Sequence, residues 1–348
     1  MAKLVKFGKP SGPLLEQKQS FFKENESRLH AAQQWAASYV KQPRRTTCKN
    51  CDAALGKGAF RKLGVEYMIC TRCGHLNGAH QDTDTFCSSL YTEDGGASYG
   101  KTYVLDNRPA FEKRRDDIYL PKVEFLMEAL HALGEDPHAL SYADFGAGSG
   151  YFVAALKSLG LDPVTGYEVS ESQVCFANAM IDKNAVTLHS PSDSVALGTS
   201  VQVDVASMIG VLEHLQDPRG MLASLAANEH IRYLYFSVPL FSLCVFIEMA
   251  FPEVMPRQLT AGHTHLYTES SIDWLCNEFG FERMAEWWFG TDMVDLYRSM
   301  LVTFESHQEL ACVAGDFDIS FKPAIDAMQL ALDERQFSSE VHMLLCKK

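Results

Sequence analysis

The chain has 348 residues, 47% of them hydrophobic and 22% charged, and its formal net charge at pH 7 is −13. That length allows two or three compact units, and that composition excludes wholesale disorder. The acidic balance argues against a protein that coats nucleic acid or anionic membranes by charge alone.

The N-terminal segment, residues 1–47, is basic and is predicted to be helical in part, from about Leu14 to Tyr39. Residues 1–50 contain ten Lys and Arg against three Asp and Glu. A run of this kind is typical of a solvated basic tail, and it is also found in proteins that bind nucleic acid. We expect the solvated tail and keep nucleic-acid binding as the alternative.

Four cysteines form two Cys-x-x-Cys pairs, which lie on either side of residues 52–69: Cys48, Cys51, Cys70 and Cys73. Two such turns can aim four thiolates at one point, which is the tetrahedral cage that zinc prefers. A closed four-thiolate shell leaves no position for a substrate, so we predict a structural zinc ion in a small module over residues 48–91.

Neither an export signal nor a membrane span is visible in the sequence. The most apolar stretch, residues 233–247, contains Pro239 and is shorter than the roughly 20 residues that a spanning helix needs. With ten cysteines and no export signal, metal binding in a reducing cytoplasm is favoured over disulfides. We therefore expect a cytoplasmic protein.

Residues 92–120 are polar and glycine-rich at their start and are predicted to connect the module to a domain over residues 121–348. A helix near its start is followed by alternating strands and helices, which predicts an α/β fold with a parallel sheet and helices on both faces. The expected strands are Leu140–Phe145, Val164–Val169, Ala185–His189, Val203–Ile209, Tyr233–Val238, Phe281–Trp288 and Val341–Cys346. The expected helices span residues 121–133, 151–159, 171–182, 218–228 and 269–279.

A glycine-rich turn follows the first of these strands. Gly146, Gly148 and Gly150 form a Gly-x-Gly-x-Gly sequence, preceded by Asp144. Glycine lets the backbone turn sharply and lets a ligand approach it closely. Glu168 lies at the end of the next strand, where an acidic group can accept hydrogen bonds from the ribose hydroxyls of a nucleoside.

The spacing of the glycines distinguishes between two cofactors. A dinucleotide turn is Gly-x-Gly-x-x-Gly, but the positions where its third glycine would fall hold Tyr151 and Val153. An acidic residue before Gly-x-Gly-x-Gly instead suits a cofactor with a cationic amino-acid end and no phosphate, which describes S-adenosylmethionine (SAM).

Together with Glu168 and the later segment Ile-Gly-Val-Leu-Glu-His-Leu-Gln-Asp-Pro over residues 209–218, this turn resembles those of class I SAM-dependent methyltransferases. The resemblance covers about residues 120–348. It implies a Rossmann-like sheet of seven strands with the last one antiparallel, and it implies that SAM is bound by Asp144, Gly146, Ala147, Gly148, Gly150, Glu168 and Ile209.

A cysteine module ahead of such a domain is similar to that of bacterial sugar methyltransferases, including those that methylate carbon in nucleotide-linked sugars. The resemblance implies a small-molecule acceptor, a sugar or nucleotide-linked sugar. Those carbon methyltransferases commonly carry a further large C-terminal domain, whereas here only a short segment, residues 289–348, follows the sixth strand.

Candidate bases for the transfer lie in the loops after the fourth and fifth strands. Glu213 and His214 follow the fourth strand, and His263 and His265 follow the fifth. A neutral imidazole can take a proton near pH 7, and alternation places residues 263 and 265 on one side of an extended segment. The alternative is that these residues bond loop backbone and shape the pocket. The sequence shows no third ligand beside the His-x-His pair, so a catalytic metal is not predicted.

These observations favour a SAM-dependent methyltransferase with a loop histidine as base. The first alternative is an RNA or protein methyltransferase that grips its macromolecule with the zinc module and the basic N-terminus. The segment Ile-Gly-Val-Leu-Glu-His argues against it, because base-amino and glutamine methylases typically carry an Asn-Pro-Pro-Tyr-like set there. The second is a non-catalytic binding protein, against which the intact glycine turn and Glu168 argue.

Overall fold

The computed structural model describes residues 3–91, 107–260 and 262–348 of the chain. Most of the predicted connector over residues 92–120 lies outside this range. Within the described residues, no helix combines the length and the apolar character needed to cross a bilayer.

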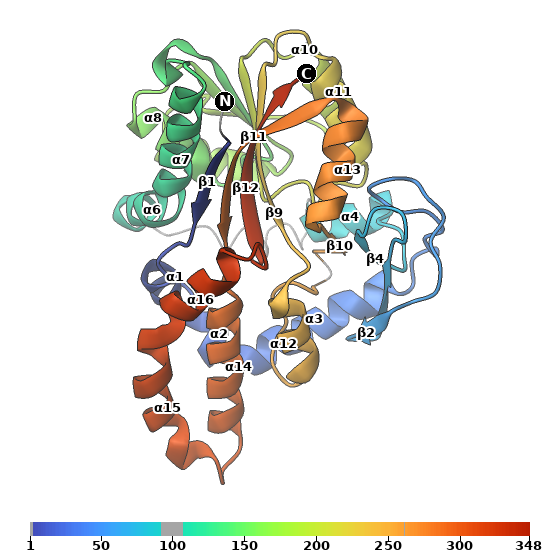
Figure 1. Ribbon diagram of the computed structural model, residues 1–348, viewed down its shortest axis with the longest axis vertical. Coiled ribbons are helices and arrows are strands. Elements are labelled where there is room, and N and C mark those ends of the chain that lie inside the picture. The colour runs from blue at the N-terminus through green and yellow to red at the C-terminus, as the bar shows by residue number, and fades with distance from the viewer. Residues whose placement is uncertain (1–2, 92–106, 261) are drawn as a thin grey trace.

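An eight-stranded sheet forms the centre of the molecule, and all seven predicted strands belong to it (Figure 1). Its order is β1-β11-β12-β9-β8-β5-β6-β7, and only β12 runs antiparallel to its neighbours. The Rossmann-like methyltransferase fold with an antiparallel last strand is therefore confirmed. The strands are β1 Leu4–Phe7, β5 Tyr142–Phe145, β6 Val164–Glu168, β7 Val186–Leu188, β8 Val205–Ile209, β9 Tyr233–Pro239, β11 Phe281–Phe289 and β12 Glu340–Lys347.

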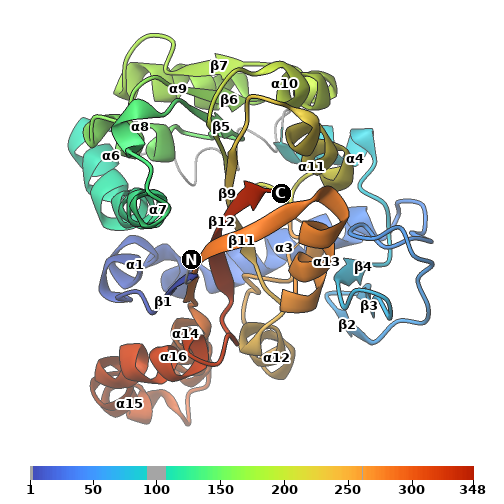
Figure 2. The same ribbon diagram turned by 45° about the horizontal axis from the view of Figure 1, so that its top comes forward.

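Helices cover both faces of this sheet, as Figure 2 shows. One face carries α7 (Leu120–Ala132), α8 (Tyr151–Ser158) and α9 (Glu171–Met180), and the other carries α10 (Ser194–Ser200), α11 (Pro218–Ala227) and α13 (Glu269–Phe279). Each face has its own buried apolar cluster, because parallel strands enclosed by helices bury side chains on both sides. This packing brings the carboxyl ends of the parallel strands to one edge.

The first strand was not predicted. β1 pairs in parallel with β11 and extends the sheet by one strand beyond the expected seven. It is followed by the predicted helical region as α1 (Gly12–Gln17), α2 (Ser20–Lys23) and α3 (Asn25–Tyr39). The expectation of a solvated basic tail is wrong, because residues 4–7 are hydrogen-bonded into the sheet. So short a strand, with Lys6 interrupting its apolar residues, gives too weak an alternation to indicate a strand.

The cysteine-bearing module contains a second, four-stranded sheet in the order β10-β4-β3-β2. Its strands are β2 Phe60–Lys62, β3 Val65–Ile69, β4 Leu76–Gly78 and β10 His265–Leu266, and α4 (Asp84–Tyr91) follows β4 along the chain. The strand β10 comes from the loop after β9, so a segment of the large domain completes the sheet of the module.

The remaining elements surround these two sheets. α6 (Arg108–Arg114) runs into a π-helical turn at Arg115–Tyr119, and α12 (Leu243–Ala250) follows β9. Between β11 and β12 lie α14 (Asp292–Ser306), α15 (Ala314–Phe321) and α16 (Ile325–Asp333), which project together from the sheet (Figure 1). Short 3-10 turns occupy Pro137–Ala139, Pro191–Asp193, Ala311–Val313 and Lys322–Ala324.

Candidate active site

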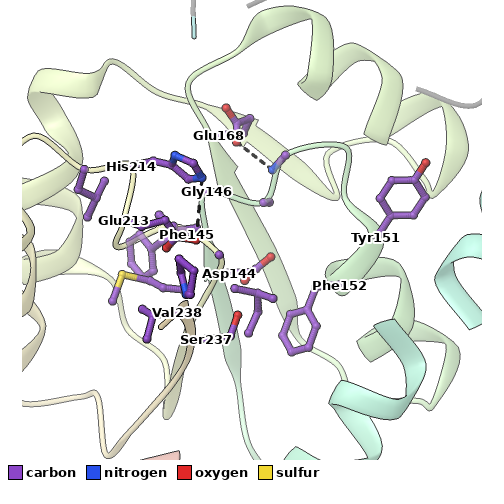
Figure 3. A pocket seen from close by; sticks show the side chains of 18 of the residues that line it. Asp144, Phe145, Gly146, Tyr151, Phe152, Glu168, Glu213, His214, Ser237 and Val238 are labelled. Carbon is purple, nitrogen blue, oxygen red and sulfur yellow. Dashed lines mark hydrogen bonds and ion pairs between the residues drawn. The ribbon is translucent and has the colours of Figure 1, made fainter. Parts of the chain in front are cut away.

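A cavity of about 810 Å³ opens at the carboxyl ends of β5, β6, β8 and β9. This is the edge where open α/β sheets bind ligands. Its lining includes the turn after β5, the loop after β8, part of the loop after β9, and the N-terminal segment around Lys9 and Lys18. Figure 3 shows how Asp144, Glu168 and His214 lie around this space.

The predicted glycine turn adopts the left-handed backbone that glycine favours. The φ angles are +68° at Gly146, +54° at Gly148 and +78° at Gly150. The N–H groups of Gly146 and Ala147 donate to the Tyr167 carbonyl at 2.8 and 3.0 Å. These bonds fix the turn against β6, so that Gly146, Ala147 and Gly148 line the cavity.

Close packing by protein atoms explains two of the three glycines. A Cβ at Gly146 would lie 2.7 Å from a methyl group of Val211, and a Cβ at Gly150 would lie 2.7 Å from the Ile181 side chain. Gly150 is not part of the cavity wall. Gly150 was predicted to bind the cofactor as well as to permit the sharp turn; the structure places it in the turn but outside the cavity wall.

Glu168 is held in place at the end of β6 by backbone N–H groups. Its Oε2 accepts from Gly148 at 2.8 Å, and its Oε1 accepts from Val169 and Ser170 at 2.8 and 2.9 Å. The carboxylate therefore bridges the glycine turn and the following loop, as the dashed line in Figure 3 shows for the glycine turn. It lines the cavity with only 7% of its surface exposed.

Asp144 lies at the end of β5 and is more deeply buried. It is 2% exposed, and its Oδ1 accepts a hydrogen bond from the Ser207 hydroxyl at 2.7 Å. Burial raises the pKa of Asp144 to about 7, the Ser207 hydrogen bond opposes this, and the charge of Glu168 adds to it. A cation placed beside this carboxylate would stabilise its charged form.

The residues around this part of the cavity fit SAM. Two buried carboxylates line it, which suits a ligand that brings a positive charge and ribose hydroxyls. Ile209, at the end of β8, adds an apolar wall, and residues 189–192 continue the lining beyond Glu168. All the residues predicted to bind the cofactor except Gly150 line this one cavity.

A second group lies in the same cavity, formed by Glu213 and His214 from the loop after β8 and by His263 from the loop after β9. One ligand-type atom from each lies within 4.8 Å of the others, and the two imidazole centroids are 5.0 Å apart. Their residue types are suited to a metal ion as well as to proton transfer. The sequence did not indicate that these three residues come together.

Hydrogen bonds orient both imidazoles in this group. The Nδ1 of His214 lies 2.8 Å from the Gly262 carbonyl, and the Nδ1 of His263 lies 3.1 Å from the Gln258 carbonyl. Because a carbonyl can only accept, each Nδ1 carries the hydrogen in this geometry, and each Nε2 is then an acceptor in the neutral ring. Burial lowers the pKa of His214 to about 4 and the pKa of His263 well below its usual value.

Glu213 is the acidic member of the group. It is 4% exposed, its Oε1 lies 3.9 Å from the His214 Nε2, and its Oε2 is buried with no hydrogen-bond partner among the described residues. Burial raises the pKa of Glu213 to about 8. A proton or a ligand donor at Oε2 would satisfy this atom.

His265 does not lie with His263. It is 1% exposed and is not part of the cavity wall, and its Nδ1 lies 2.8 Å from the Nε2 of His75 in the cysteine module. Residues 265 and 266 form β10, and that pairing directs the imidazole toward the module. The expectation that both histidines serve the same site is therefore corrected: His263 reaches the cavity and His265 does not.

Five cationic side chains, here called the cationic wall, also line the cavity, and sequence analysis did not predict them: Lys9, Lys18, Arg114, Lys122 and Arg257. Two of them, Lys9 and Lys18, belong to the basic N-terminal segment, which was interpreted from the sequence as a solvated tail. The pKa of Lys9 and that of Lys18 are both lowered to about 7, chiefly by burial and next by the charge of Lys122 on Lys9 and of Arg257 on Lys18. Strand β1 fixes the chain segment that brings these two lysines to the cavity.

The four predicted zinc ligands meet in the module. Cys48, Cys51, Cys70 and Cys73 are buried, and their sulfur atoms all lie within 4.8 Å of one another. The Cys48–Cys73 and Cys51–Cys70 sulfur distances are 3.7 and 3.5 Å. Tetrahedral Zn–S bonds of about 2.3 Å place sulfurs roughly 3.8 Å apart. The donor set therefore fits zinc.

One protein-family model matches the chain. Residues 112–286, about half of the sequence, match the model described as "Methyltransferase domain". No curated protein sequence matches the chain.

Several solved structures are similar in fold. Magnesium protoporphyrin IX methyltransferase from Synechocystis PCC 6803, solved with SAH, has a TM-score of 0.47 and 17% identity over 76% of this chain and 100% of that chain. The plantazolicin methyltransferase BpumL, also with SAH, has a TM-score of 0.45 and 16% identity over 75% and 93%. A SAM-dependent methyltransferase from Archaeoglobus fulgidus has a TM-score of 0.41 and 13% identity over 70% and 100%.

Proposed function

The chain belongs to the methyltransferase-domain family and is a SAM-dependent methyltransferase, and we propose that its acceptor is a small molecule, a sugar or nucleotide-linked sugar. The observation that carries the proposal is the set of groups in a single cavity. Two buried carboxylates, Asp144 and Glu168, share it with the cationic wall and with the group around Glu213. The charges of Arg257 and Lys18 act on His263, which supports a position for this histidine beside the cationic wall.

At the cofactor site, Asp144 would pair with the ammonium group of the methionine moiety and Glu168 would accept from the ribose hydroxyls. The turn through Gly146, Ala147 and Gly148 and the side chain of Ile209 would enclose the remainder. Bound SAM supplies an electrophilic methyl group on a sulfonium. The protein therefore has two remaining tasks, which are to position the acceptor in line with that methyl and to remove its proton.

We assign the proton acceptor to the pair His214 and His263. Their Nδ1 atoms face backbone carbonyls, so each neutral ring presents Nε2 as a base. Transfer of the acceptor's proton to one Nε2 creates an imidazolium. In its ionised form, Glu213, whose Oε1 lies 3.9 Å from the His214 Nε2, stabilises that imidazolium. Glu213 thus acts with the histidines.

Residues 48–91 are proposed to be a structural zinc module. Four thiolates fill the tetrahedral shell, so the metal would stabilise the module without contacting the acceptor. Because β10 belongs to the module's sheet, the module also holds the loop that carries His263.

The distribution of the basic residues argues against an RNA methyltransferase. Within the described residues, several N-terminal cations are engaged with acidic partners: Lys3 pairs with Glu286, Arg44 with Glu66, and Arg45 and Lys49 with Asp82. Lys9 and Lys18 line the cavity. Much of the charge that suggested nucleic-acid binding is therefore not displayed as a basic outer surface, which such binding requires.

The test is incubation of the full chain with SAM labelled on its methyl group and with separated pools of nucleotide sugars, glycans, RNA and protein. We expect label in the nucleotide-sugar or glycan pool, and no transfer by the His214→Ala, His263→Ala double variant. Label in RNA or protein would refute the acceptor assignment. Equal transfer by the double variant would refute the base assignment.

A further inference from the structure

We propose that Lys9 and Lys18, with Arg114 beside them on the cationic wall, form an anion subsite that binds a phosphate group of the acceptor. The inference deepens the proposed function, since it rests on the acceptor occupying this part of the cavity. It narrows the acceptor to a phosphorylated small molecule, whatever its carbon skeleton.

Three separate elements bring these cations to one cavity. Lys9 follows β1, Lys18 follows α1, and Arg114 ends α6. They are close enough to act on one another, since Lys18 and Arg114 both lower the pKa of Lys9, and Arg114 lowers that of Lys18. Like charges repel, so an anion bound between these cations would relieve the repulsion and favour the charged form of both lysines.

Within the part of the chain that the structure describes, Lys9 and Lys18 form no ion pair with a carboxylate. Among the described residues, no carboxylate oxygen lies within 4.0 Å of the ammonium of Lys9 or Lys18. The nearby acidic groups are engaged with other cations, Glu340 with Lys122 at 3.4 Å and Asp295 with Arg257 at 2.8 Å. The positive charge of the lysines is therefore available to a ligand.

Hydrogen bonds and an aromatic contact hold these cations in position. The Lys9 ammonium donates to the Ile118 carbonyl at 3.3 Å, and the Lys18 ammonium lies 5.0 Å from the Phe21 ring centroid. Arg114 donates to the Gln17 side chain at 3.0 Å. A carbonyl and an aromatic ring are uncharged, so these contacts orient Lys9 and Lys18 without cancelling the charge of either ammonium.

Phosphate fits this arrangement better than a carboxylate does. Cations on separate elements can approach different oxygens of a phosphoryl group, which carries up to two charges, whereas a carboxylate offers two oxygens and one charge. The whole chain has a net charge of −13, so a cluster of positive side chains in one cavity is opposite in sign to the net charge of the protein.

The subsite also has an electrostatic relation to the proposed base. His263 lines the same cavity as Lys9 and Lys18, and the charges of Arg257 and Lys18 both lower the pKa of His263. An acceptor anchored by its phosphate at Lys9 and Lys18 would therefore extend toward His263 and the methyl group. Anchoring through a charged group remote from the reaction is an effective way to position a reacting atom.

The test is titration calorimetry of the full chain with inorganic pyrophosphate, in the presence and absence of SAH, with acetate as the monoanionic comparison. We expect pyrophosphate to bind and acetate to bind at least about tenfold more weakly. The Lys18→Met variant should lose at least about tenfold in pyrophosphate affinity, since a charge-assisted hydrogen bond is removed. Lys18→Arg should retain most of it.

Lys23→Met is the matched control, because Lys23 is exposed on α2 and does not line the cavity. SAH affinity, measured on each variant, reports whether the fold is intact, and Lys9→Met serves as a second variant. Unchanged pyrophosphate affinity in both Lys18→Met and Lys9→Met would overturn the subsite, as would acetate binding as tight as that of pyrophosphate. Absence of SAH binding in the unmodified chain would refute the proposed function separately.

Discussion

Replacing Asp144 with asparagine should stabilise the ligand-free protein while weakening cofactor binding. Burial raises the pKa of this carboxyl from an ordinary 3.8 to about 7. Because the folded state binds the proton more tightly than the unfolded state, the ionised carboxylate lowers the free energy of unfolding increasingly as the pH rises from the lower pKa to the higher one. The difference between the pKa values in the unfolded and folded states lowers the free energy of unfolding by about 4 kcal/mol at pH 8 and by about 1.5 kcal/mol at pH 5.

Asparagine has the same shape, and its carbonyl oxygen can accept the Ser207 hydroxyl hydrogen as Asp144 does at 2.7 Å. Asp144→Asn should therefore raise the free energy of unfolding by up to about 4 kcal/mol at pH 8, and by less at pH 5. Water that enters the cavity reduces both values. The variant should also bind SAM at least about tenfold more weakly, because the partner of the ammonium group is lost.

Urea unfolding at the two pH values, with calorimetry of SAM binding, measures both effects. Asp193→Asn is the control, because Asp193 is exposed and does not line the cavity. A variant that is less stable than the original at pH 8, or a gain in stability equal at both pH values, would show that Asp144 is not a desolvated carboxylate. Unchanged SAM affinity would remove it from the cofactor site.

Three further outcomes are expected. Glu168→Gln should weaken SAH binding by about tenfold to a hundredfold, because the amide places a donor where backbone N–H groups also donate. Calorimetry measures the affinity, and Glu171→Gln, at an exposed position, is the control that should leave it unchanged. Equal SAH affinities of Glu168→Gln and the unmodified chain would contradict the ribose assignment. His263→Ala should lower kcat with little change in SAH affinity, and an unchanged kcat would exclude it as a base. Elemental analysis should find one zinc ion per chain, and the Cys48→Ser variant should lose that zinc and unfold at a lower Tm. A second metal ion per chain would indicate that the group around Glu213 binds metal, contrary to its proposed role.

Local sequence was sufficient for the features that depend on neighbouring residues. Strand β5, the tight turn from Gly146 to Gly150 and helix α8 follow one another in one short segment, so the geometry of the turn follows from residue type alone. The Cys-x-x-Cys pairs were likewise predictable from local sequence, because each short turn positions two sulfur atoms side by side. The alternation of apolar segments likewise predicted the seven strands of the expected fold.

Features that depend on pairing across the chain were missed. Strand β1 ends at Phe7 and is stabilised by β11, which begins only at Phe281, and nothing within β1 indicates that distant partner. The same holds for the group around Glu213, since His263 reaches it only because β8 and β9 are adjacent in the sheet. His265 was misplaced for a related reason, because a strand pairing with the module determines its direction.

That pairing connects the proposed zinc module physically to the loop of the proposed base. The Gly78 N–H donates to the carbonyl of Thr264, the residue after His263, at 2.7 Å, and His265 pairs with Asn77 in the next position of the ladder. Asn77 in turn donates to the sulfur of Cys48 at 3.5 Å. A continuous series of contacts thus runs from a proposed zinc ligand to the loop of the proposed base. Since a base must be held within hydrogen-bond reach of the proton it removes, a structural metal at this position can support turnover by fixing that loop, without binding the acceptor.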